Sequence, residues 1–336
     1  MPSIHTNRTK KSDANTCGTG MGLRDLAMLA ERPLVIVGPT ASGKSDLAMG
    51  VARLIGGAEI VTLDSMQVYR GMDVGTATPT AAEQAEVPHH LINLVDPREE
   101  FAVAELQARA RTVIDEIRDR GAVPVLVGGT GLYVRAVIDA LKIPGRYPTV
   151  RAELEADPDT EALHRRLVEL DPVAAGRMEP TNRRRVVRAL EVTIGSGQPF
   201  SSYGPGLGHY PPTPFVQVGL RWDRDRLDER IASRYQQQMA AGFLDEVRAL
   251  AERPISRTAS QALGYKELLE HVQGETTLHE ALELAVVRTR RFARRQERWF
   301  RRDPRIHWLD APTSPADVLS VWKRAAGTLP TKRRSG

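Results

Sequence analysis

The segment GPTASGKS, residues 38–45, decides the fold, and it directly follows the apolar run LVIV, residues 34–37. Its spacing is that of a phosphate-binding loop (P-loop), G-x-x-x-x-G-K-[ST], which connects a buried strand to a helix. In such a loop the backbone N–H groups and the lysine bind phosphate oxygens, and the last hydroxyl binds Mg²⁺. We therefore predict a polyphosphate site with Ser45 as the metal ligand. The expected binding residues are Gly38, Pro39, Thr40, Ala41, Ser42, Gly43, Lys44 and Ser45.

Composition and charge restrict the class of protein and of partner. With 336 residues and 41% hydrophobic content, the chain can bury a sizeable core. No apolar stretch has the length of a membrane span, no signal peptide is evident, and the single cysteine, Cys17, excludes a disulfide framework. These features predict a cytoplasmic protein. The formal net charge of +5 and the clustered arginines favour a polyanionic partner, nucleic acid first.

Strand and helix patterns alternate from residue 33 to about 141, and the strand runs are continuously apolar. This favours an α/β fold with a P-loop NTPase-like core, in which helices cover both faces of a parallel sheet. Residues 144–197 are charged, helical in period and interrupted by prolines, so we predict a helical insertion there. The predicted division is a disordered leader (1–30), the first part of the core (31–143), the helical insertion (144–200), the second part of the core with C-terminal helices (201–327) and a disordered tail (328–336).

Two chemically important positions follow predicted strands. Asp64 ends the second strand run, where it is a metal ligand, a general base or the cap of the next helix. The run VPVLV is followed by Gly128, Gly129 and Thr130 instead of the acidic residue with which an ATPase binds Mg²⁺ and activates water. Glycines at this edge let a ligand approach the backbone, and Thr130 adds a hydroxyl. ATP hydrolysis is therefore disfavoured.

Several longer blocks accompany the P-loop in a fixed order. They are DSMQVYRGMDVGTATP (64–79), VPHHLINLVDP (87–97), GGTGLY (128–133), ALGYKEL (262–268) and RRFARRQERWFRR (290–302). Together with GPTASGKS they resemble the tRNA dimethylallyltransferase (tRNA isopentenyltransferase) family. The resemblance extends from about residue 34 to residue 310, which is nearly the whole expected folded chain.

The resemblance implies a reaction and a role for each matching residue. The family transfers the five-carbon group of dimethylallyl diphosphate to N6 of the adenosine just 3′ of the anticodon in tRNA and releases diphosphate. The P-loop then binds this diphosphate and not ATP. Mg²⁺ and Lys44 stabilise the leaving group, and Asp64 is the base, with Thr130 holding the amine. The implied partners are the anticodon stem-loop of tRNA and dimethylallyl diphosphate, with no membrane and one monomer per tRNA.

The resemblance also implies contacts with tRNA. The implied tRNA-binding residues are Asp64, Ser65, Met66, Gln67, Thr130, Arg151, Arg184, Arg185 and Arg188, of which Arg184 stands where the family usually has glutamine. Nearer the C-terminus, a helical face repeats Arg291, Arg294, Arg295, Arg298 and Arg302. It follows the tRNA backbone or frames the diphosphate. The interleaved aromatic residues Phe292, Trp299 and Phe300 are predicted to pack inward.

Three alternatives remain open. An adenylate isopentenyltransferase has the same chemistry with free AMP or ADP as acceptor, but a small nucleotide needs neither the insertion nor the arginine clusters. A small-molecule P-loop kinase gives no account of the DSMQVYRGMDVGTATP block. An inactive RNA-binding protein is disfavoured because Lys44, Ser45, Asp64 and Thr130 are all retained.

Overall fold

A six-stranded parallel sheet forms the centre of the molecule. The computed structural model describes residues 21–328, and the strand order in its sheet is β3-β2-β4-β1-β5-β6, with each neighbouring pair parallel. The strands are β1 (Leu34–Val37), β2 (Ala58–Thr62), β3 (His89–His90), β4 (Val123–Gly128), β5 (Val216–Arg221) and β6 (Ile306–Asp310). The predicted fold class is confirmed. The two-residue strand β3 was not predicted.

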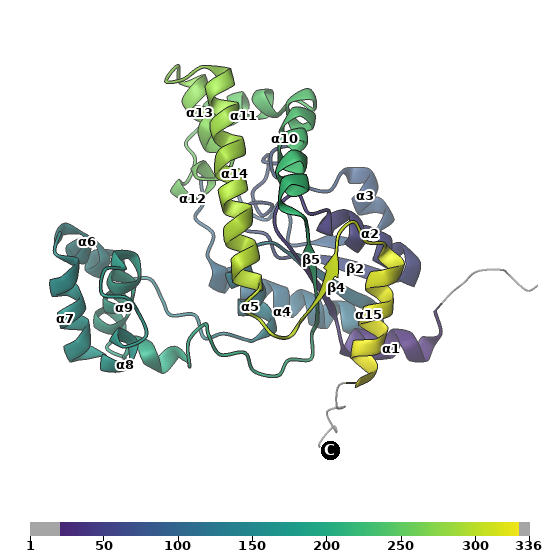
Figure 1. Cartoon of the computed structure of the whole chain (residues 1–336), viewed down its shortest axis with the longest axis horizontal. Coiled ribbons are helices and arrows are strands. Elements are labelled where there is room, and N and C mark those ends of the chain that lie inside the picture. Colours follow the sequence, from purple (N-terminus) through teal and green to yellow (C-terminus); the bar gives the residue numbers. More distant parts are fainter. Residues whose placement is uncertain (1–20, 329–336) are drawn as a thin grey trace, which may run out of the picture.

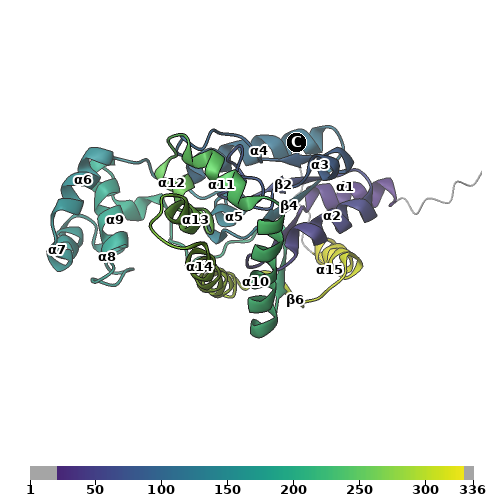
Figure 2. The same cartoon turned by 90° about the horizontal axis from the view of Figure 1, so that it is seen from above.

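Helices cover both faces of this sheet, and the strand side chains alternate between two cores. Leu34 and Ile36 belong to one core, whereas Val35 and Val37 of the same strand belong to the other. The first face is covered by α1 (Leu23–Glu31), α2 (Lys44–Ile55) and α15 (Pro315–Thr328), and the second by α4 (Val103–Asp119) and α5 (Gly131–Ile138). Figure 2 shows the two layers on either side of the strands.

The N-terminal boundary of the core differs from the prediction. The leader was expected to extend to residue 30, but LRDLAMLAE forms helix α1, and its Leu29 is fully buried in the core with α2 and α15. Apolar residues at helical spacing give this short segment one face to bury, which explains why it is ordered. Residues 1–20 lie outside the described part of the chain. The expected tail does as well, apart from Thr328, the last residue of α15.

Four helices form a separate unit, which we call the helical unit. It consists of α6 (Pro148–Ala156), α7 (Thr160–Leu170), α8 (Pro172–Ala175) and α9 (Arg183–Ser196), and the short 3₁₀ helix η1 (Phe200–Tyr203) follows it. Leu154, Leu167 and Leu190 are buried in a small core of its own. Figure 1 shows the unit to the left of the sheet, joined to it by a first connecting segment (residues 139–147) and a second one (residues 204–215).

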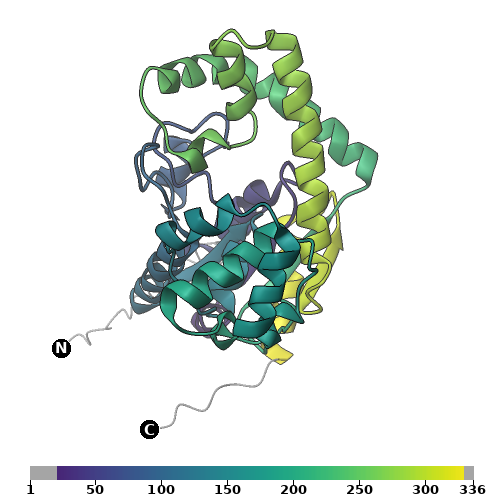
Figure 3. The same cartoon turned by 90° about the vertical axis from the view of Figure 1, so that its left-hand side faces the viewer.

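Five further helices rise above the sheet (Figures 1 and 3). They are α10 (Arg224–Ala240), α11 (Phe243–Ala251), α12 (Arg257–Ser260), α13 (Tyr265–Val272) and α14 (Leu278–Phe300). The short helix α3 (Ala81–Glu86) precedes β3 in the sequence. Phe243 and Tyr265 pack edge to face, with ring centroids 4.8 Å apart. This group of helices shares its core with α4 and α5, so it is continuous with the sheet.

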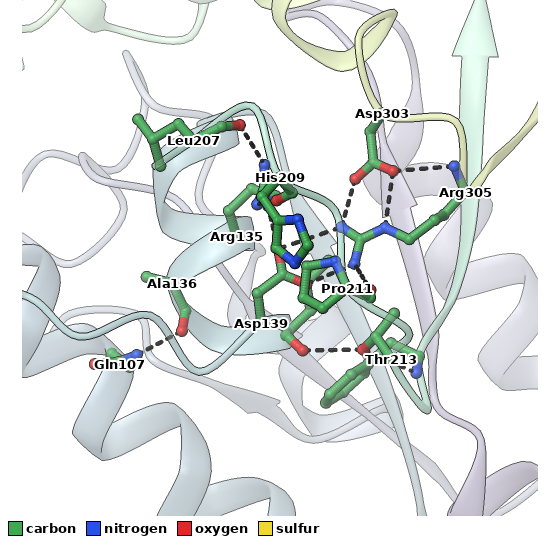
Figure 4. A network of polar contacts seen from close by, with 12 residues as sticks. Gln107, Arg135, Ala136, Asp139, Leu207, His209, Pro211, Thr213, Asp303 and Arg305 are labelled. Atoms are coloured by element: carbon green, nitrogen blue, oxygen red, sulfur yellow. Dashed lines mark hydrogen bonds and ion pairs between the residues drawn. The ribbon is translucent and has the colours of Figure 1, made fainter. Parts of the chain in front are cut away.

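A buried ionic network fastens the second connecting segment to the sheet domain (Figure 4). Asp139, whose side chain is fully buried, pairs with Arg135 of α5 and with Arg305, whose Nη1 lies 2.7 Å from Asp139 Oδ1. The two arginines also donate to the alternate carbonyl groups of Leu207, His209 and Pro211. Three carbonyl groups of this segment are therefore held by the same two arginines.

This network should dominate the local stability. We expect Asp139→Ala to lower the free energy of unfolding by about 3–5 kcal/mol, because it leaves buried Arg135 and partly buried Arg305 without their shared carboxylate. Urea denaturation measures this change. The control is Asp310→Ala, which breaks an exposed pair with Arg221 (2.6 Å) and should leave stability nearly unchanged. Equal losses in the two variants would contradict a special role for the buried network.

Candidate active site

The parallel sheet gathers the predicted site residues at one edge. The P-loop follows β1, Asp64 follows β2, Thr130 follows β4 and Trp222 follows β5. Since all these strands run in the same direction, their carboxyl ends meet at one edge of the sheet, where α/β proteins bind ligands. The structure therefore brings together the P-loop, Asp64 and Thr130, which are 20 to 90 residues apart in sequence.

The P-loop has the backbone of an anion site. Gly43 adopts a left-handed conformation (φ 80°) immediately before α2, so the N-terminus of this helix opens toward the loop. Lys44 Nζ donates to the carbonyl of Pro39 at 3.3 Å. Burial lowers the pKa of Lys44 to about 8, although the negative charge of Asp64 acts in the opposite direction. Among the described residues, the buried Oγ of Ser42 has no hydrogen-bond partner.

Two arginines of α10 complete the cationic side of this loop, and the sequence analysis missed both. Arg230 Nε donates to the carbonyl of Ala41 at 2.9 Å and stacks on Trp222, whose indole donates to Ser42. Arg234 Nη1 donates to Thr40 Oγ1 at 3.3 Å, and burial lowers the pKa of its guanidinium while Asp64 raises it. Their four-residue spacing on a helix was a visible signal. It was obscured by the abundance of arginine elsewhere.

Asp64 and Thr130 both keep groups available for chemistry. The Oδ1 of Asp64 accepts the N–H of Met66 at 2.8 Å, whereas in the described part of the chain no hydrogen bond engages Oδ2. Thr130 occupies the N-cap position of α5, yet its hydroxyl makes no capping bond. Asp64 thus shapes its own turn and still presents a carboxylate oxygen. Either proton transfer or metal binding is open to it.

The block that follows Asp64 is held by helices far along the chain. The carboxylate of Glu246 accepts backbone N–H groups of Asp73, Val74 and Gly75 at 2.7–3.1 Å, and the hydroxyl of Tyr265 at 2.6 Å. The buried amide of Gln67 donates to the carbonyls of residues 76 and 77. The amide N–H groups of Gln67 are therefore used to hold this loop. Met66, in contrast, lines the groove described below.

Gln296 of α14 joins the two sides of the site and was also missed. It is 8% exposed, its Oε1 accepts the N–H of Thr40 at 2.9 Å and its Nε2 donates to the carbonyl of Gly129 at 2.8 Å. The residue was visible only as one letter in the arginine-rich block near the C-terminus. Nothing in a helical pattern indicates which loops such a side chain will reach.

A large groove lies between the helical unit and the sheet domain. Its volume is about 2340 Å³, and Met66, Trp299 and Arg302 line its inner side. The other basic residues that line it are Arg135, Lys142, Arg146, Arg151, Arg177, Arg183, Arg184, Arg185, Arg188 and Arg257. Its four acidic lining residues are Glu100, Asp139, Glu155 and Glu191. The groove is thus strongly cationic and far larger than a mononucleotide requires.

The four predicted arginines of the helical unit fall into two classes. Arg184 and Arg185 are exposed, and within residues 21–328 their side chains make no ion pair. Arg151 and Arg188 lie 3.2 and 2.8 Å from the carboxylate of Glu191, whose side chain is 1% exposed. Arg188 also donates to a carbonyl in the first connecting segment. The second pair therefore holds the unit together as well as lining the groove.

The arginine face of α14 is likewise divided. Arg294 pairs with Asp228 of α10 at 2.9 Å. The others in the set, Arg291, Arg295, Arg298 and Arg302, are exposed and recur every three or four residues along one side. Phe300 and Trp299 pack against the core as predicted, while Phe292 is half-buried beneath the guanidinium of Arg295. The cations nearest the P-loop are thus those of α10, and the exposed α14 arginines face outward.

Within residues 21–328, no group of three or more His, Cys, Asp or Glu side chains is arranged to hold a metal ion. No helix in the same range has the length and apolar character of a membrane span.

The chain matches known protein families over most of its length. A family model described as IPP transferase matches residues 67–303, and one described as isopentenyl transferase matches residues 32–94. A tRNA dimethylallyltransferase of Kineococcus radiotolerans is 50% identical over 309 residues, which cover 89% of this chain and 96% of that protein.

Solved structures show the same similarity. The full-length tRNA isopentenylpyrophosphate transferase of Bacillus halodurans is 40% identical, with a TM-score of 0.64, and the match covers 88% of this chain and 96% of that one. A eukaryotic dimethylallyltransferase acting on tRNA shares the fold with a TM-score of 0.73 at 24% identity, over 90% of this chain and 81% of that one.

Arg234 should contribute directly to anion binding. We expect Arg234→Met to weaken the binding of inorganic diphosphate about 10- to 100-fold, because a charge-assisted contact in a buried site is lost. Isothermal titration calorimetry measures the change. Arg226→Met, on the exposed face of the same helix, is the matched control and should bind like the unmodified protein. Unchanged affinity in Arg234→Met would remove this residue from the site.

Proposed function

The chain belongs to the tRNA dimethylallyltransferase family, and from this premise we propose that it transfers the dimethylallyl group of dimethylallyl diphosphate to N6 of the adenosine on the 3′ side of the anticodon. One observation carries the proposal. A P-loop without an ATPase acid, a carboxylate and a free threonine hydroxyl share one edge of the sheet beside an arginine-lined groove of about 2340 Å³. The first three suit prenyl transfer to an amine, and the groove suits a polyanion larger than AMP.

The P-loop side of the site would bind the leaving group. Diphosphate departs when the allylic C–O bond breaks, so negative charge grows on the oxygen that joined the diphosphate to the allylic carbon. Lys44 and Arg234 lie at the loop as half-buried cations, where their attraction for this charge is stronger than in water. The N-terminus of α2 adds backbone N–H groups to the same oxygens.

Asp64 and Thr130 would act on the acceptor. The N6 amine is a weak nucleophile, because its lone pair is delocalised into the ring. Asp64 takes a proton from the amine as the C–N bond forms, through the carboxylate oxygen that its own turn leaves open. Thr130 holds the amine from the adjacent strand end. The adenosine must leave its stack to reach them, which costs a few kcal/mol and less from a loop than from a duplex.

The residues present fit a magnesium ion that arrives with the diphosphate. Ser45 offers one hydroxyl at the start of α2, and the described residues hold no cluster that would bind the ion alone. Magnesium in phosphate sites takes most of its ligands from substrate oxygens and water, which agrees with a single protein hydroxyl. When bound, the ion would neutralise charge on the departing diphosphate.

The helical unit and α14 would hold the tRNA. Exposed Arg184 and Arg185 line one side of the groove, and Arg302 lines the other. Three exposed arginines of α14, Arg291, Arg295 and Arg298, continue from Arg302 along the helix. Unpaired guanidinium groups in these places suit the phosphates of an anticodon stem-loop. One groove accommodates one such stem-loop, so we propose that the protein acts as a monomer. We also propose that it acts in the cytoplasm.

The decisive assay supplies purified protein, Mg²⁺ and dimethylallyl diphosphate with either unmodified tRNA or AMP. Mass spectrometry of the nucleosides should find the five-carbon addition on adenosine from tRNA and none on AMP. Addition to AMP would move the protein to the adenylate branch. A separate incubation with ATP is the control, and ATP consumption there, without transfer to either acceptor, would favour a kinase.

The role of Asp64 is tested in the same assay. We expect Asp64→Asn to lower the transfer rate about 10²–10⁴-fold, because the variant keeps the turn but cannot take the proton. Binding of tRNA should change little, since the substitution removes only one of many contacts. A variant that transfers at the normal rate would exclude Asp64 as the base.

The exposed arginines should control the salt dependence of tRNA binding. We expect the double variant Arg184→Gln/Arg185→Gln, and separately the triple variant Arg291→Gln/Arg295→Gln/Arg298→Gln, to bind tRNA more weakly. Each lost phosphate contact should flatten the log–log salt slope by about 0.7–0.9. Affinity for diphosphate should stay unchanged. Arg111→Gln, at an exposed position of α4, is the control, and an equal effect there would mean that only the net charge matters.

A further inference from the structure

The side chain of Gln296 makes two hydrogen bonds of opposite kinds, one as acceptor and one as donor. Its Oε1 accepts from Thr40 N–H (2.9 Å) in the P-loop, and its Nε2 donates to Gly129 C=O (2.8 Å) beside Thr130. A carboxylate can only accept, and an apolar chain can do neither. The amide therefore matches a donor on one loop and an acceptor on the other.

These two loops lie beyond the reach of the sheet. The paired residues nearest the site in β1 and β4 are Val37 and Gly128. Thr40 comes three residues after the first, and Gly129 and Thr130 come directly after the second. Past the ladder, the distance between the P-loop and Thr130 is no longer set by backbone pairing. Gln296, distant from both loops in sequence, spans this gap.

Helix α14 is itself held firmly at this point. One turn after Gln296, Trp299 packs on Gly131, where an added Cβ would come within 2.1 Å of the indole, so only glycine fits. On its other sides the helix is tied to α10 by Arg294 with Asp228 (2.9 Å) and to α13 by Arg288 with Glu267 (2.5 Å). A side chain carried by so well-anchored a helix can fix the position of two loops.

We propose that Gln296 is a positioning residue that sets the spacing between the diphosphate cradle and the amine held at Thr130. The inference rests on the proposed transfer reaction. In productive turnover the allylic C–O bond breaks, a C–N6 bond forms and the amine proton passes to Asp64. If the spacing loosens, water attacks instead: the same C–O bond breaks, a new C–O bond forms, and the products are dimethylallyl alcohol, diphosphate and a proton.

Both outcomes release one diphosphate, so the ratio of modified adenosine to released diphosphate reports the spacing. We expect this ratio to be near one in the unmodified protein and to fall in Gln296→Met. The transfer rate should decline about 10- to 100-fold, since misplacement by 1 Å costs about that much. The KM for tRNA should change little. Gln296→Glu, which keeps the size and the acceptor but loses the donor, should show the same change and guards against a folding defect.

Gln217→Met is the matched control. Gln217 is buried in β5 at 2% exposure and its Nε2 has no partner among the described residues, so it should keep the unmodified ratio. A ratio that stays near one in both Gln296 variants, while rate and thermal stability fall together, would show a structural role only and overturn the proposal. Absence of any transfer by the unmodified protein would instead refute the proposed function, on which the inference depends.

Discussion

The parallel register of β1, β2 and β4 is the constraint on which the site depends. Val37 is paired with Gly128 and Thr62 with Val127, so the chain leaves all three strands at nearly the same height. Whatever follows these strands must meet at one edge. The P-loop, Asp64 and Thr130 are neighbours for this reason, and their order in the sequence is irrelevant to their proximity. The apolar strand residues, buried on both faces, provide the stability that holds this register.

Strand ends alone do not make the site, because loops beyond the ladder are not fixed by it. Helices that come more than 150 residues after the P-loop complete it. Arg234 of α10 brings a second half-buried cation to Thr40, Glu246 of α11 accepts three backbone N–H groups after Asp64, and Gln296 of α14 connects the two sides. The sheet thus provides the arrangement, and the later helices provide its precision.

This difference explains what could be predicted from the sequence. The P-loop and the residues after each strand were predictable, because they follow from local patterns and from the direction of parallel strands. Arg230, Arg234 and Gln296 were not, because each acts through a contact with a loop far away in sequence. Helix α1 was mistaken for part of the leader, since nine residues give a weak periodic signal. The arginines of the helical unit were identified by resemblance. Only the structure distinguishes exposed Arg184 and Arg185 from Arg188, which forms an ion pair with Glu191.

Helix α14 links the two substrates of the proposed reaction through its opposite sides. Its inner side carries Gln296 and Trp299 to the loops where chemistry would occur, and its outer side carries exposed arginines in line with Arg302, which lines the groove. Because a helix of 23 residues is stiff and is anchored to α10 and α13, its two sides cannot shift independently. A tRNA bound along the outer side would therefore be placed in a fixed relation to the diphosphate cradle. Selection of the adenosine and capture of the allylic carbon then depend on the same rigid element.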